Sequence, residues 1–249
     1  IGGNVGNASL TTTSSVLTLP KASLKSGQNL LTVVVDYHGH DQTSTAKGVE
    51  NPRGILGASL LPKTTSSTGF TQWKIQGNAG GSKNLDPVRG PMNEGGLYAE
   101  RLGWHLPGFT PDSSFDRNGP STGLSTSGLR FYTTTFHLNI DSDLDVPLGI
   151  ELGAPVGTVA RVMIWVNGYQ YGKYVPHIGP QTRFPVPPGV INNRGLNTVA
   201  LSLWAMTDEG AKVDTVKLIS YGAYQTDFEF NKDWSALQPG WDESRLQYA

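Results

Sequence analysis

Short segments of alternating apolar and polar residues recur along the chain. In residues 131–140 (FYTTTFHLNI), the more apolar side chains fall on one face of an extended strand, namely Tyr132, Thr134, Phe136, Leu138 and Ile140. The other face carries Phe131, Thr133, Thr135, His137 and Asn139. This pattern predicts a half-buried β-strand.

Four other segments are equally rich in branched and aromatic residues: 30–37 (LLTVVVDY), 159–166 (VARVMIWV), 198–204 (TVALSLW) and 213–220 (VDTVKLIS). Asn-Gly, Pro-Pro-Gly and Asn-Arg-Gly turns separate the later ones. No window of a dozen residues has helical periodicity. We therefore predict an all-β protein, built as a β-sandwich or jelly roll.

One sequence pattern occurs twice. It consists of an apolar-Pro pair, a short turn, Gly-x-Asn and an apolar strand. The first copy begins at Leu19-Pro20 and passes through Gly27-Gln28-Asn29, and the second begins at Val186-Pro187 and passes through Gly195-Leu196-Asn197. Predicted strands precede the second copy from about Leu129, but the chain starts shortly before the first. We expect the first unit to lack its opening strands, which another segment of a longer polypeptide would supply because unpaired strand edges are unstable.

The composition agrees with a turn-rich β protein. Glycine and proline make up 47 of 249 residues, about 19% against an average of roughly 12%. Asp, Glu, Lys and Arg account for 16%, where about a quarter is typical. The length suits one large or two ordinary domains. We divide it into residues 1–123, an incomplete first unit with a connector, and residues 124–249, a second unit with a C-terminal tail.

Charge and cysteine content exclude several classes of protein. Nineteen basic and 20 acidic residues give a net charge of −1, without a basic run that would favour nucleic acid. The apolar stretches are too short to span a membrane. The absence of cysteine excludes disulfides, thiolate zinc sites and cysteine nucleophiles. Since the chain begins with Ile1 instead of Met, we expect a processed product or a fragment.

Few residues suggest catalytic or metal chemistry. His38-Gly39-His40 could hold a metal only with Asp36 or Asp41, and loop histidines are more often solvated or hydrogen-bonded, so we predict neither a metal site nor a cofactor. There is no Gly-x-Ser-x-Gly serine motif and no phosphate-binding loop. Glu94 and Glu100 could form a glycosidase pair, but neighbouring arginines favour ionised, salt-bridged carboxylates.

Aromatic residues indicate carbohydrate binding more strongly. Sugars stack on aromatic rings and bind side-chain amides, and the candidates with this chemistry are Trp104, Tyr169, Gln170, Tyr171 and Tyr174. Tyr169 and Tyr171 alternate past a turn, so we expect one of them to face solvent. Trp165 and Trp204 lie in predicted strands and are interpreted as core residues. The sequon Asn7-Ala8-Ser9 is a candidate glycosylation site, which suggests secretion or a chance match.

Several motifs together resemble one family. They are residues 166–174 (VNGYQYGKY), Gly179-Pro180-Gln181, residues 184–187 (FPVP) and Leu196-Asn197, and further upstream residues 51–56 (NPRGIL), 73–78 (WKIQGN) and 88–101 (VRGPMNEGGLYAER). They look like the C-terminal jelly-roll domains of glycoside hydrolase family 35 β-galactosidases, and in particular the large secreted fungal members. The resemblance runs from about Ser14 to Ala211.

The resemblance implies two galactose-binding-like jelly rolls, the first without its N-terminal strands. It also implies secretion, and a partner in the rest of the parent polypeptide with its N-terminal catalytic domains. In that family two glutamates of an α/β barrel hydrolyse terminal β-galactosides. A barrel takes roughly 250 residues of alternating strands and helices, and this chain has no such pattern, so no catalytic residue is carried over.

Three functions remain open at the level of sequence. The first is a non-catalytic segment that supports the catalytic domain of a secreted β-galactosidase and binds galactosides in addition. The second is a free-standing carbohydrate-binding, lectin-like β-sandwich. The third is one half of a nicked enzyme whose parts stay together in an active form. No nucleic acid or membrane partner is expected for any of them.

Overall fold

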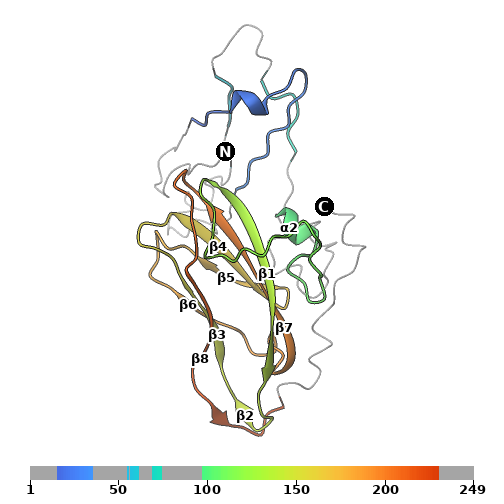
Figure 1. Ribbon diagram of the computed structural model, residues 1–249, viewed down its shortest axis with the longest axis vertical. Helices are drawn as coiled ribbons and strands as arrows, with labels where there is room; N and C mark the ends of the chain where they lie inside the picture. The colour runs from blue at the N-terminus through green and yellow to red at the C-terminus, as the bar shows by residue number, and fades with distance from the viewer. Residues whose placement is uncertain (1–15, 36–54, 56, 62–68, 75–96, 230–249) are drawn as a thin grey trace, which may run out of the picture. The chain divides into compact units, whose positions relative to one another are not determined.

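The computed structural model of the chain describes residues 16–35, 55, 57–61, 69–74 and 97–229 (Figure 1). Its contacts divide the chain into two compact units. One comprises residues 19–75, and the other comprises residues 1–18 together with 76–249. Each unit is described by itself, beginning with the larger one.

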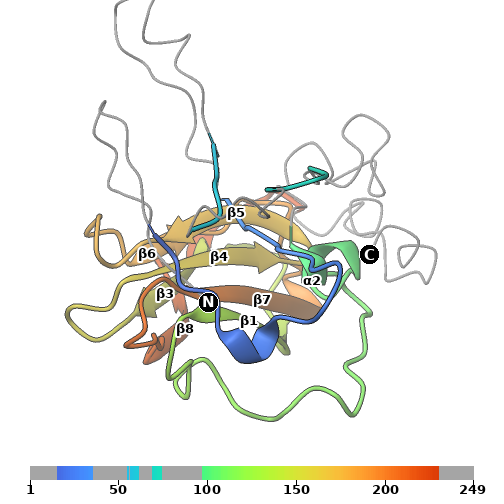
Figure 2. The same ribbon diagram turned by 90° about the horizontal axis from the view of Figure 1, so that it is seen from above.

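The larger unit is a β-sandwich. A four-stranded sheet has the order β1-β7-β4-β5, a three-stranded sheet has the order β6-β3-β8, and β2 pairs with β9 (Figures 1 and 2). The strands are β1 (Gly128–Asn139), β2 (Leu144–Asp145), β3 (Leu148–Gly153), β4 (Ala160–Val166), β5 (Tyr169–Tyr174), β6 (Arg183–Pro185), β7 (Arg194–Ala205), β8 (Thr215–Ser220) and β9 (Tyr224–Gln225). A four-residue helix, α2 (Tyr98–Arg101), precedes them. The prediction of an all-β protein is confirmed.

One apolar core lies between the two main sheets. The four-stranded sheet contributes Val162, Ile164, Leu201 and Leu203, and the three-stranded sheet contributes Ile150, Leu152 and Phe184, among others. Tyr132, Phe136, Leu138 and Ile140 pack against this core, as the alternation in residues 131–140 predicted. The fifth residue of that face, Thr134, is exposed. Buried apolar area of this kind is the main stabilising contribution to a sandwich.

Strands β4 and β7 are buried on both faces. Ala200 and Trp165 point away from the main core and form a second cluster with Leu97 and Met163, against which Phe131 packs. A strand covered on both sides has no solvent face to fill with polar residues. This explains why residues 160–166 of β4 and 199–205 of β7 carry few polar side chains.

Two asparagine amides join the turn between β4 and β5 to the loop before β7. Asn167 and Asn197 are each 1% exposed, and the Asn167 amide nitrogen donates to the Oδ1 atom of Asn197 at 2.8 Å. Asn167 also donates to the carbonyl of Val190 at 2.7 Å, and its Oδ1 accepts the backbone N–H of Thr198 at 2.8 Å. Each amide hydrogen of this pair therefore has an acceptor, which buried polar groups require.

The loop before β7 is held by the second amide of the pair. Asn197 donates to the carbonyls of Asn192 and Gly195 at 2.8 and 3.2 Å, and its Oδ1 accepts the N–H of Asn192 at 2.7 Å. Asn167 itself has a φ of 49°, in the left-handed region that asparagine tolerates better than most residues. The sharp Asn167-Gly168 turn and the loop are thus fixed to each other.

The smaller unit differs from the sequence prediction. Its described residues include a short 3-10 helix, η1 (Lys21–Ser23), but residues 30–35 do not form a strand. Leu30 is 94% exposed, and Leu31, Val33, Val34 and Val35 are also exposed. The strand predicted at residues 30–37 is therefore wrong for residues 30–35 of this chain, because a strand needs a ladder partner and the described residues do not supply one. Residues 36 and 37 lie outside the described residues.

The other predicted strands are confirmed with small shifts of their ends. Residues 131–140, 159–166, 198–204 and 213–220 correspond to β1, β4, β7 and β8. Trp165 is fully buried, as predicted, and Trp204 is half-buried. The division into residues 1–123 and 124–249, and the jelly-roll form of both units, stay predictions.

We predict that Asn197→Ala lowers the free energy of unfolding by about 3 kcal/mol, because several buried donors and acceptors each lose a partner at about 1–3 kcal/mol. Urea unfolding followed by tryptophan fluorescence measures this. The exposed Asn139 is the matched control, and Asn139→Ala should change stability by less than about 0.5 kcal/mol. A loss below about 1 kcal/mol for Asn197→Ala would show that the amide pair does not hold the loop.

Candidate functional site

Four of the five predicted sugar-binding residues lie in β5, and its pairing with β4 decides which face each one occupies. Val166 pairs with Tyr169 and Trp165 with Gln170, after which the register shifts so that Ile164 pairs with Gly172. The shift is a β-bulge, which places one extra residue, Tyr171, between the paired positions. Beyond it, Val162 pairs with Tyr174.

Tyr174 and Tyr171 turn toward the main core. Tyr174 is 4% exposed, and its hydroxyl accepts the backbone N–H of Ala154 at 3.1 Å. Its ring meets Phe184 edge-on at 6.3 Å between centroids. Tyr171 packs against the same core, and burial raises the pKa of its hydroxyl well above the ordinary value. The rings of Tyr171 and Tyr174 both face the core, so we leave these residues out of the candidate surface.

Gln170 lies on the opposite face of the sheet. It shares that face with Trp165, its partner across the ladder, and with Lys173, which pairs with Met163. Tyr169 is half-buried at the beginning of the strand, directly after the Asn167-Gly168 turn. The structure places Gln170 on one face of the sheet and both Tyr171 and Tyr174 on the other. A strict alternation of residues 169–174 would instead have put Tyr174 on the same face as Gln170.

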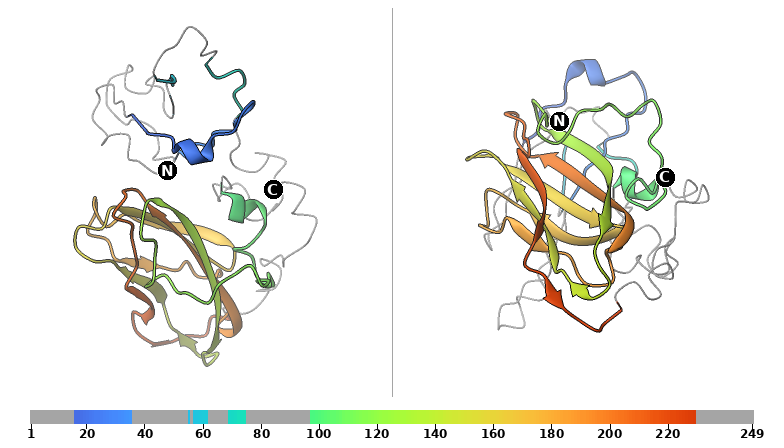
Figure 3. Two further views of the ribbon diagram at one scale, coloured as in Figure 1. Left: turned by 45° about the horizontal axis from the view of Figure 1, so that its top comes forward. Right: turned by 60° about the horizontal axis from the view of Figure 1, so that its bottom comes forward.

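Trp104 lies over the same outer face as Gln170. The chain leaves α2 in a tight turn in which the Trp104 N–H donates to the carbonyl of Ala99 at 3.0 Å. The half-buried Trp104 ring contacts four others, with centroid distances of 4.7 Å to Phe115, 5.9 Å to Tyr98, 6.0 Å to Phe131 and 6.2 Å to Phe109. Figure 3 shows α2 beside the four-stranded sheet.

Small residues on the central strand let these rings meet. Phe131 on β1 and Trp165 on β4 flank β7, where Ala200 and Ser202 occupy the outer face. The centroids of Phe131 and Trp165 are 5.4 Å apart, and His105 lies 5.9 Å from Trp165. We call Trp104, Phe131, Trp165 and Gln170 the aromatic face. Two of the five predicted residues lie on it at opposite edges of the sheet, Trp104 against Phe131 of β1 and Gln170 on β5.

Several carboxylates of the described residues have structural partners. Glu100 is 3% exposed and accepts the N–H of Leu97 at 3.4 Å, where α2 begins. Glu94, its proposed glycosidase partner, lies outside the described residues. Hydrogen bonds from Ser114 and Asn118 hold the pKa values of Asp112 and Asp116 below their ordinary value, and a hydrogen bond with Thr207 does the same for Glu209. A general acid needs a raised pKa instead.

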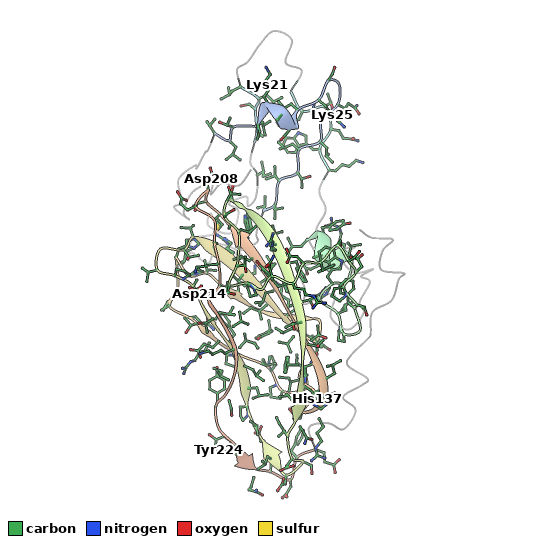
Figure 4. The ribbon with its side chains drawn as sticks, viewed as in Figure 1. Lys21, Lys25, His137, Asp208, Asp214 and Tyr224 are labelled. Atoms are coloured by element: carbon green, nitrogen blue, oxygen red, sulfur yellow. The ribbon has the colours of Figure 1, made fainter. Side chains whose placement is uncertain are left out.

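Other acidic residues of the sandwich each have a different partner. Asp208 accepts the Ser127 hydroxyl at 2.7 Å, at the opposite end from Tyr224 (Figure 4). Asp214 pairs with Lys212 at 2.9 Å, and Glu151 with Arg183 at 3.4 Å. Across the described residues, no three His, Cys, Asp or Glu side chains gather as metal ligands would. The candidates His38 and His40, and the sequon asparagine Asn7, fall outside them.

Two further observations bear on the site. His177, in the loop after β5, has its pKa lowered by burial and by the positive charge of Arg161. Within the described part of the chain, no helix is long and apolar enough to cross a membrane.

Comparison with known proteins shows which domain the larger unit resembles. Residues 98–209 match a family model described as the beta-galactosidase second all-beta domain. These residues are therefore similar to that domain. Over its full length the chain is 68% identical to a probable beta-galactosidase C of Sclerotinia sclerotiorum and 60% identical to one of Neosartorya fischeri. It spans about a quarter of the length of these relatives, covering 25% of each.

A solved structure is similar at a much lower level. A family 35 carbohydrate binding module from an environmental isolate matches 48% of this chain and 88% of its own length, with 15% identity and a TM-score of 0.25. Nothing about ligand or activity transfers at this similarity. Because the chain covers only a quarter of these relatives, it is a fragment of a beta-galactosidase-like polypeptide.

The sequence analysis did not single out the two residues that organise the larger unit. Asn167 and Asn197 are part of the motifs that carry the family resemblance, but a buried side-chain amide pair between them could not be read from either motif alone. The signal was present in part, as an Asn-Gly turn and as the Asn of the repeated Gly-x-Asn pattern.

We predict that the aromatic face of the larger unit stabilises the fold. Replacing Trp104 by alanine removes contacts to four rings and should lower the free energy of unfolding by about 2–4 kcal/mol, somewhat less than for a fully buried tryptophan. Tyr98, which is exposed and touches the cluster by one edge, is the control, with an expected loss below about 1 kcal/mol. Equal losses for the two variants in urea unfolding would contradict this role.

Proposed function

We propose that this chain is a non-catalytic, C-terminal part of a secreted beta-galactosidase and that it supports the catalytic domain. Its relatives carry the name of that enzyme, and the chain matches a quarter of their length. The observation that carries the proposal is the exposed apolar run of residues 30–35. Such a run is stable in water only when another part of a polypeptide covers it.

The chemistry of the described carboxylates supports a non-catalytic role. Retaining glycosidases hold two carboxyl groups roughly 5–5.5 Å apart and raise the pKa of one of them. Here Glu100 binds the backbone at the start of α2, and Asp112, Asp116 and Glu209 have lowered pKa values. Carboxylates that are fixed or ionised in this way do not donate a proton to a leaving group.

The sandwich is suited to a supporting role. Its central strands are buried on both faces and its turn and loop are joined by the Asn167–Asn197 pair, so it is a rigid body that can hold a neighbouring domain. Secretion is part of the proposal, and the sequon at Asn7 supports it. Glycosylation of Asn7 would place the parent polypeptide in the secretory route.

The experiment compares three proteins: this chain alone, the full parent polypeptide, and the parent without the quarter that this chain matches. We expect no release of nitrophenol from nitrophenyl β-galactoside by the chain alone. The parent should hydrolyse this substrate, and removing the quarter should shorten its half-life at elevated temperature at least tenfold. Turnover by the purified chain, or an unchanged half-life after the deletion, would contradict the proposal.

Carbohydrate binding is a second candidate function of the same chain. Two groups on the outer face of one sheet favour it, the half-buried Trp104 ring beside β1 and the Gln170 amide on β5. Aromatic rings and side-chain amides are the groups that bind sugars. Galactosides are the ligands we propose. Tyr169 lies at the β4–β5 end of the same domain and remains a candidate, whereas Tyr171 and Tyr174 face the core.

Titration calorimetry with galactose and lactose tests this second function. We expect binding with a dissociation constant in the millimolar range, and at least a fivefold weakening in Gln170→Ala. Asn139→Ala, on the exposed side of β1, is the control and should bind as the unchanged protein does. An absence of heat at millimolar ligand, or equal affinity for both variants, would contradict carbohydrate binding at this face. Only the supporting role would then remain.

A further inference from the structure

The two copies of the Gly-x-Asn pattern fold into the same local structure. In the second copy, the Asn197 amide donates to the carbonyl of Gly195 at 3.2 Å and to that of Asn192 at 2.8 Å. In the first copy, the Asn29 amide donates to the carbonyl of Gly27 at 3.2 Å and to that of Lys25 at 2.9 Å. The internal repeat is therefore present in the structure as well as in the sequence.

The acceptor side of the amide also agrees. The Oδ1 atom of Asn197 accepts the backbone N–H of Asn192 at 2.7 Å, and that of Asn29 accepts the N–H of Lys25 at 2.9 Å. The loop of the first copy is one residue shorter. Otherwise each asparagine closes its loop in the same way, immediately before an apolar segment.

The second copy is also bound by a further residue, Asn167. Asn167, in the Asn-Gly turn at the end of β4, donates its amide to Asn197 Oδ1 and accepts the N–H of Thr198. Its own backbone N–H donates to the carbonyl of Thr198 at 2.8 Å. From this anchor β4 runs antiparallel along β7, beginning with the pair Val166 and Val199.

Neither Asn-Gly pair of this sequence is available at the end of a strand to repeat that contact. Its sequence contains two Asn-Gly pairs, Asn118-Gly119 and Asn167-Gly168. The second is bound to Asn197, and the first is followed by Pro120 and lies in a loop, where the N–H of Thr122 donates to Gly119. Three quarters of the length of the relatives, in contrast, lie outside this chain.

We propose that a strand from the rest of the parent polypeptide, ending in an Asn-Gly turn, pairs antiparallel with residues 30–35. The asparagine of that turn donates its amide to Asn29 Oδ1 and accepts the backbone N–H of Leu30, as Asn167 does with Asn197 and Thr198. This interaction surface rests on the proposed function, since it requires a parent polypeptide.

The repeat also assigns the two faces of the completed strand. Leu31, Val33 and Val35 occupy the positions of Val199, Leu201 and Leu203, which lie in the main core of the sandwich. Leu30, Thr32 and Val34 occupy the positions of Thr198, Ala200 and Ser202, on the other face. A second copy of this chain does not fit as the partner, because its Asn167-Gly168 turn is already bound to its own Asn197.

Hydrogen exchange with mass spectrometry tests the proposal on the full parent polypeptide and on this chain alone. We expect the amides of residues 30–35 to exchange at least 100-fold more slowly in the parent. Asn29→Ala should speed this exchange at least tenfold in the parent and leave it unchanged in the chain alone. Asn139→Ala is the control and should affect neither. If residues 30–35 exchange equally fast in the unsubstituted parent and in the chain alone, the proposal is wrong.

The partner is then identified by replacement. Each Asn-Gly asparagine of the parent outside this chain is changed to alanine in turn. One of these variants should reproduce the effect of Asn29→Ala, and combining the two should speed exchange no further. If none does, or if the chain alone protects residues 30–35 as a dimer, the proposal is wrong. Catalysis by the isolated chain would refute the proposed function instead, so the two failures are distinguishable.

Discussion

The hydrogen bond between the side chains of Asn167 and Asn197 is the interaction on which the larger unit depends. An unpaired amide in the core would cost roughly 1–3 kcal/mol, and this pair is satisfied only when the β4–β5 turn and the loop before β7 occupy their observed positions. That placement fixes the register of β4 on β7. The register in turn puts Trp165 opposite Ala200 and creates room for the aromatic face.

The same register explains what the sequence could predict. Alternation within residues 131–140 is a local property, and it correctly identified the side chains of β1 that pack against the core. The bulge in β5 is not local, because it arises from pairing with β4, and so the burial of Tyr171 and Tyr174 could not be inferred from their spacing. The short strands β3 and β6, rich in glycine or proline, lacked a pattern long enough to recognise. Residues 30–35 have strand composition without a partner, and composition carries no information about partners.

For the candidate site, residue type was a better guide than position. Trp104 and Gln170 were selected for their chemistry, and the structure places both over one face of the sheet, although they are far apart in the sequence. The asparagine pair was overlooked because each residue looks like an ordinary turn former in isolation. A non-catalytic support and a sugar-binding module share this rigid architecture, so fold alone does not separate them. The distinction depends on the exposed apolar run of the smaller unit.

The central claim is that this chain is structurally incomplete without the rest of its parent polypeptide, and an experimental structure of the full-length protein tests it most directly. The account predicts that residues 30–35 form a ladder with a strand from outside this chain, with an Asn-Gly turn within hydrogen-bonding distance of Asn29. A full-length structure in which residues 30–35 remain exposed to solvent, or pair only with other residues of this chain, would contradict it.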